Sequence, residues 1–197
     1  MVPILGWTLA EIAGLSRLGI VVQVADLREI APSARTLPDR MRQAIRYFPC
    51  DVLFVHRDAE GQPLEWRIEE VRRSVSQTQI HPCVPIVPVQ MTEAWLLIDQ
   101  QAIRRAAGNP HGRVFLSLPP VTRLEQLADP KSKLHQCLEI ASEKSGRRLD
   151  QFQRRIGERV QRVAALIEDF SPLRSLPAFA QFEATAREVI TGVLPGN

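Results

Sequence analysis

Asp51-Val-Leu-Phe-Val-His-Arg-Asp-Ala-Glu60 is a short apolar run that ends in a cluster of charged side chains. The run is rich in β-forming residues and is followed by Gly61-Gln-Pro63, which predicts a buried strand over residues 52–55 rather than a helix. In an open α/β sheet, ligands bind just beyond the carboxyl ends of the strands. Asp58 and Glu60 are therefore expected at the sheet edge where a functional site would form.

Helices and strands alternate over the first 110 residues. Two more apolar runs predict strands over residues 20–25 and 84–89. Helical spacing of apolar residues predicts helices over 3–18, 38–48, 64–77 and 92–107, with Thr92 as the N-cap of the last. This alternation predicts an α/β fold with a mainly parallel sheet flanked by helices.

The pattern changes after residue 110. An extended, proline-ended linker over 114–120 precedes sequence that is helical throughout. The expected elements are a short turn near 123–127 and helices over 131–143, 149–170 and 177–193. The sequence thus predicts an α/β domain over residues 1–113 and an all-helical C-terminal extension over 114–197 that packs on it.

The composition is that of a soluble globular protein. The chain has 197 residues, of which 45% are hydrophobic and 24% charged, and no apolar run approaches the ~20 residues needed to span a bilayer. Three widely spaced cysteines favour a reduced, cytoplasmic protein over a disulfide framework. A net charge of +3 permits nucleic-acid binding without demanding it. The chain has neither a glycine-rich phosphate loop nor Gly-x-Ser-x-Gly, which argues against ATP hydrolysis and serine-hydrolase chemistry.

Three carboxylates form the candidate catalytic and metal site. Asp58 and Glu60 are two positions apart, and Glu93 begins the helix after the next strand, at the same edge of a parallel sheet. Oxygen ligands in this arrangement suit Mg²⁺ or Mn²⁺. The same residues are also compatible with a charged surface turn and with a glutamate that stabilises a helix N-terminus.

Basic residues are candidates for contacts to phosphate. Arg57 adjoins Asp58, and Lys131 follows Asp129-Pro130. Four arginines fall on one stripe of the predicted 149–170 helix and its approach, where they fit either a nucleic-acid backbone or a solvated face paired with glutamates. They are Arg148, Arg155, Arg159 and Arg162.

Two segments resemble an uncharacterised bacterial family of Toprim-like proteins, related to the overcoming-lysogenisation-type nuclease domains. They are Val55-His-Arg-Asp-Ala-Glu60 and Val84-Pro-Ile-Val-Pro-Val-Gln-Met-Thr-Glu-Ala-Trp-Leu-Leu-Ile-Asp99, supported by Ala106-Ala-Gly-Asn-Pro110. The resemblance implies a Toprim/Rossmann-like fold, a Mg²⁺-dependent nuclease activity, a setting in phage defence and a possible ATPase partner. Asp58-Ala-Glu60 matches the family's Asp-x-Asp motif, with Glu in place of the second Asp.

One part of the Toprim pattern has no counterpart. The family has a strand and an acidic residue just before the helix that here begins at Pro3. The resemblance therefore implies a chain that starts one strand late, with an incomplete acidic set and an exposed sheet edge that favours self-association. Two functions follow, a metal-dependent phosphodiesterase or nuclease and a non-catalytic interaction or regulatory subunit that works with an ATPase. Sequence-specific DNA binding is a third and weaker interpretation.

Overall fold

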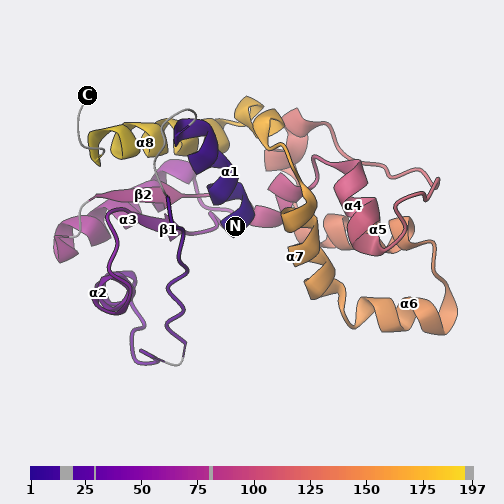
Figure 1. Cartoon of the computed structure of the whole chain (residues 1–197), viewed down its shortest axis with the longest axis horizontal. Coiled ribbons are helices and arrows are strands. Elements are labelled where there is room, and N and C mark those ends of the chain that lie inside the picture. The colour runs from indigo at the N-terminus through magenta and orange to yellow at the C-terminus, as the bar shows by residue number, and fades with distance from the viewer. Residues whose placement is uncertain (14–19, 29, 80–81, 194–197) are drawn as a thin grey trace.

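A small parallel sheet lies at the centre of the α/β part of the chain. The computed structural model describes residues 1–13, 20–28, 30–79 and 82–193. Strand β1 (Leu53–His56) pairs in parallel with β2 (Cys83–Ile86), with Leu53 opposite Cys83 and His56 opposite Ile86. Figure 1 shows both strands beneath the C-terminal helix. The described residues contain these two strands and no third.

Helices cover both faces of this sheet. On one face, Phe54 packs against the cluster that contains Ile4 of α1 (Val2–Ala13) and Ile190 of α8 (Pro177–Val193). On the other face, Val55 packs against Met41 of α2 (Leu37–Tyr47) and Val71 of α3 (Leu64–Thr78). Successive side chains of a strand point to opposite faces, so one short strand contributes to both layers.

The remaining helices form the lobe at the right of Figure 1. These elements are η1 (Thr92–Leu96), α4 (Gln100–Ala107), η2 (Val121–Gln126), α5 (Pro130–Ser142), α6 (Gly146–Gln153), α7 (Ile156–Leu166) and η3 (Ser171–Ser175), where η marks a 3₁₀ helix. Asp99 begins α4 by accepting the N–H groups of Gln101 and Ala102, and Gly108 ends it at a φ of +79°.

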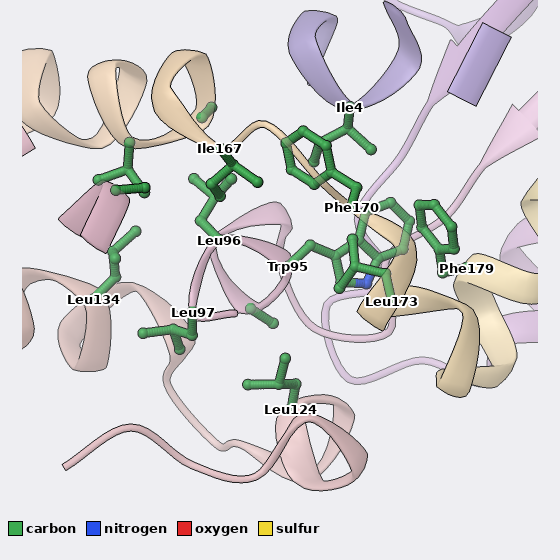
Figure 2. Close-up of a cluster of buried hydrophobic side chains, with 14 of the residues drawn as sticks. Ile4, Trp95, Leu96, Leu97, Leu124, Leu134, Ile167, Phe170, Leu173 and Phe179 are labelled. Atoms are coloured by element: carbon green, nitrogen blue, oxygen red, sulfur yellow. The ribbon is translucent and has the colours of Figure 1, made fainter. Parts of the chain in front are cut away.

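Trp95 lies at the junction between the sheet and the helical lobe. Its side chain is fully buried, and its ring meets that of Phe179 edge to face with centroids 5.3 Å apart. Figure 2 shows the indole between Phe170, Leu173 and Phe179, with the aliphatic side chains of the lobe beyond it. The packing of Trp95 thereby also fixes the position of the two residues before it, Glu93 and Ala94, beside the sheet.

The structure confirms a mixed α/β fold with a parallel sheet flanked by helices and a helical C-terminal part. The predicted helices over 38–48, 64–77, 131–143 and 177–193 correspond to α2, α3, α5 and α8. The helix predicted over 3–18 is present as far as Ala13, and its last residues lie outside the described part. The Toprim/Rossmann-like fold and the division at residues 113 and 114 stay predictions; Trp95 and Phe179, from either side of that division, share one hydrophobic cluster.

Three predictions about secondary structure are wrong. Residues 20–25 are not a strand, because no described segment pairs with them. The helix predicted over 92–107 is η1 followed by α4, since Asp99 starts a new helix. The helix predicted over 149–170 is broken after Gln153, because α6 packs on α5 whereas α7 packs mainly on α4.

Candidate functional site

Asp58 lies at the carboxyl end of β1. The backbone on either side of it stays bonded to the end of β2 and to the chain that follows: Arg57 N donates to Ile86 O at 3.0 Å and Ala59 N to Pro88 O at 2.9 Å. The carboxylate Oδ1 of Asp58 accepts the backbone N–H of Thr92 at 3.2 Å and its hydroxyl at 3.4 Å. The end of β1 is thus joined to the start of η1, as a parallel topology requires.

His56 belongs to the same cluster, and sequence reasoning missed it. Its Nε2 lies 2.9 Å from the hydroxyl oxygen of Thr92 and 3.3 Å from Oδ1 of Asp58. The signal was present in the sequence, because residues two apart in a strand point to the same side, so a histidine at position 56 shares a face with Asp58. Thr92 was predicted only as a helix cap, but its side chain binds across to β1 instead of capping.

Glu93 and the start of α1 lie close to Asp58. Burial lowers the pKa of the Met1 amino group, and the negative charges of Glu93 and Asp58 act on that pKa in the opposite direction. Glu93 follows Thr92, whose backbone N–H donates to Asp58, so the start of η1 lies beside the end of β1. The beginning of α1, the end of β1 and the beginning of η1 therefore meet at one edge of the sheet.

Glu60 is turned away from this cluster. The residue has a φ of +51° and precedes Gly61 at +79°, so the chain leaves the extended path that would have kept positions 56, 58 and 60 on one face. Its carboxylate is 70% exposed and pairs with Arg67 of α3 at 3.4 Å. The structure therefore joins Asp58 to the start of η1, where Glu93 lies, and turns Glu60 toward Arg67 of α3.

The two predicted phosphate-binding residues are in different places. Arg57 points to the face opposite Asp58, where it pairs with Glu70 of α3 at 3.3 Å, and Arg67 shares that glutamate at 2.9 Å. The Nε atom of Arg57 is buried and has no hydrogen-bond partner within the described chain. Lys131 is exposed in the first turn of α5, in the helical lobe and away from β1 (Figure 1).

The arginine stripe is divided between surface and structural roles. Arg155 pairs with Glu158 at 3.0 Å. Arg159 stacks over the ring of Phe152 and donates to the carbonyl of Ala106 at 3.1 Å, which satisfies the end of α4. These contacts favour the interpretation of a paired helix face over that of a track for a phosphate backbone.

Two carboxylates, a histidine and a hydroxyl make up the candidate site. Within residues 1–13, 20–28, 30–79 and 82–193, no group of three or more His, Cys, Asp or Glu side chains is arranged to hold a metal ion. Mg²⁺ nevertheless needs only one or two carboxylates when waters and a substrate phosphate fill its other positions. The oxygen chemistry of Asp58 and Glu93 fits such an ion, and their supporting contacts come from Thr92 and His56.

Comparison with known proteins identifies no relative. No family model, no curated protein and no solved structure matches this chain. No described helix is long and apolar enough to cross a bilayer.

Proposed function

We propose that this chain is a Toprim-like, Mg²⁺- or Mn²⁺-dependent phosphodiesterase that acts on nucleic acid. The observation that supports the proposal is the hydrogen bond from Thr92 N to Asp58, which joins the carboxyl end of β1 to the start of η1, where Glu93 lies. Sheet edges of this kind are where α/β proteins bind ligands. The phage-defence setting and the ATPase partner remain part of the proposal through the family resemblance alone.

Asp58 and Glu93 would hold the ion by carboxylate oxygens. The bound ion would polarise a phosphoryl oxygen and supply an activated water for in-line attack. The backbone N–H of Thr92 fixes Oδ1 of Asp58, leaving the second oxygen for the ion. The Nε2 atom of His56 lies 2.9 Å from the hydroxyl oxygen of Thr92 and would orient that hydroxyl.

The third acidic group of the Toprim pattern belongs to the residue before the first helix. The start of α1 lies near Asp58 and Glu93, so an acidic residue joined to that end would reach the same pair. Glu60, by contrast, is engaged with Arg67 and is not needed for the proposed site. The acidic residues that we propose for ion binding in this chain are accordingly Asp58 and Glu93.

A non-catalytic interaction subunit is the second candidate. It is favoured by the absence of a three-ligand group within the described residues and by the turning away of Glu60. In that case the Asp58–Thr92 contact serves to join η1 to the sheet. The two functions differ in whether the chain binds a divalent ion at all.

Calorimetric titration with Mn²⁺, with plasmid nicking run in parallel, separates the two functions. The chain is compared with Asp58→Asn, Glu93→Gln and the matched control Glu60→Gln. We expect Asp58→Asn and Glu93→Gln to lose ion binding and nicking, and Glu60→Gln to keep both. Ion binding without nicking would favour a regulatory subunit. Absence of Mn²⁺ binding, both in this chain and in a form with an acidic residue placed before Met1, would overturn the phosphodiesterase proposal.

A further inference from the structure

A groove of about 1450 Å³ runs along the free side of β1. Residues 20–25 also line the groove. Apolar side chains cover its two faces, from α1 and α8 on one and from α2 on the other. They include Leu5, Leu9, Ile190, Met41 and Ala44. Helices therefore lie on both sides of the groove.

The edge of β1 that faces the groove is open for hydrogen bonding. Leu53 N donates to Pro82 O and Arg57 N to Ile86 O, both toward β2 at 3.0 Å. Backbone groups alternate in direction along a strand, so the amides and carbonyls of Phe54 and His56 point into the groove. Among described residues, no backbone group bonds to these two from that side.

The outer edge of β2 differs. Pro85 occupies an outward position there and has no N–H to offer, and α3 and α8 lie beside it. Proline and covering helices are two ways in which proteins block an edge strand. The sheet is thus closed on the β2 side and open on the β1 side.

We propose that the groove binds one extended segment of a partner polypeptide, which pairs with β1 and completes the sheet. The segment would be about five residues long, the usual length of a strand. Because helices cover both faces, its side chains are apolar at successive positions rather than at alternate ones. The main-chain bonds provide affinity and the two apolar faces provide specificity, as in other cases of strand addition.

Charge at the groove determines what flanks this apolar segment. Four arginines and two acidic residues line the groove, so its charge is positive. They are Arg35, Arg40, Arg57, Arg73, Asp51 and Glu70. The partner segment therefore carries acidic residues on either side of its apolar stretch. This inference does not depend on metal binding or catalysis.

The probe is a synthetic peptide of five valine and isoleucine residues with two aspartates at each end. Backbone amide exchange of the whole chain is followed by NMR with and without the peptide. We expect the peptide to slow exchange at Phe54 and His56 at least tenfold and to leave Leu53 and Arg57 unchanged, since those two already donate to β2. A peptide N-methylated at its three central residues keeps the apolar side chains but should give no protection.

Three outcomes would overturn the proposal. The first is no change at Phe54 and His56 at millimolar peptide. The second is protection of both amides before any peptide is added, because the chain itself or a second copy would then fill the groove. The third is equal protection by a single-stranded oligonucleotide. The acidic flanks are tested separately: Arg35→Glu should weaken peptide binding several-fold, whereas the matched control Arg123→Glu, outside the groove, should not, and equal affinities would refute that assignment.

Discussion

Substitution of Phe179 by alanine should destabilise the whole chain and not only its C-terminal part. The ring is fully buried and contacts three aromatic rings, with centroids 5.3 Å from Trp95, 5.7 Å from Phe182 and 6.5 Å from Trp7. A buried Phe→Ala change costs about 3–5 kcal/mol, from lost burial and from the cavity that remains. Since a domain is stable by only about 5–15 kcal/mol, this loss is a large part of the total.

Urea denaturation followed by tryptophan fluorescence measures the loss. Phe179 lies in the predicted C-terminal extension and Trp95 in the predicted α/β domain, so the variant should shift one cooperative transition in which both parts unfold. Phe115→Ala is the matched control, because that ring is 80% exposed and its removal should change stability by less than about 0.5 kcal/mol. A cost below about 1 kcal/mol for Phe179→Ala, or two separate transitions with only one shifted, would refute this reasoning.

Three further predictions concern side chains away from the candidate site. Arg174 pairs with carboxylates on α1 and α8 and stacks on Trp7, so Arg174→Ala should cost about 1 kcal/mol in denaturant melts, and the cost should fall as salt is added. Burial raises the pKa of Glu125, which accepts a backbone N–H at the start of α8. The folded chain therefore holds this proton more tightly than the unfolded chain, and the free energy of unfolding should fall as pH rises from the ordinary pKa of 4.5 through the raised one. Thermal melts at several pH values should show this fall for the parent and not for Glu125→Gln. Burial raises the pKa of Cys83 to about 12, so at pH 8 a thiol reagent should label the exposed Cys50 well before Cys83, as mass spectrometry of the digested protein would show.

Helices were predicted well because their signals are local. The helix over residues 177–193 was predicted with the bounds that α8 has, since a proline opens it and apolar residues recur at helical spacing. The errors arose where tertiary contacts outweigh spacing. The apolar stripe over residues 149–170 continues through the break at Arg154, and only the different partners of α6 and α7 divide it. Packing directions of that kind are not encoded in periodicity.

The candidate site was predicted in part. Asp58 lies beside the start of η1, where Glu93 lies, because parallel strands place their carboxyl ends at one edge, a rule that needs only the order of the elements. Glu60 does not join them, because its left-handed backbone conformation turns the chain after Ala59. A search for carboxylate ligands does not find His56, although its two-residue spacing from Asp58 places it on the same face.

Residues 20–25 show why a strand is harder to predict than a helix. Their sequence, Ile-Val-Val-Gln-Val-Ala, has strong β propensity, and Val21 and Val24 are nevertheless 91% and 61% exposed. A helix satisfies its hydrogen bonds within one segment, whereas a strand requires a neighbour at the right distance. Here β1 and residues 20–25 line the same groove, and no described segment pairs with residues 20–25. The strand prediction fails because residues 20–25 lack a paired neighbour among the described residues, and the outer edge of β1 lacks one as well. Protection of the Phe54 and His56 amides tests whether a partner segment pairs with β1.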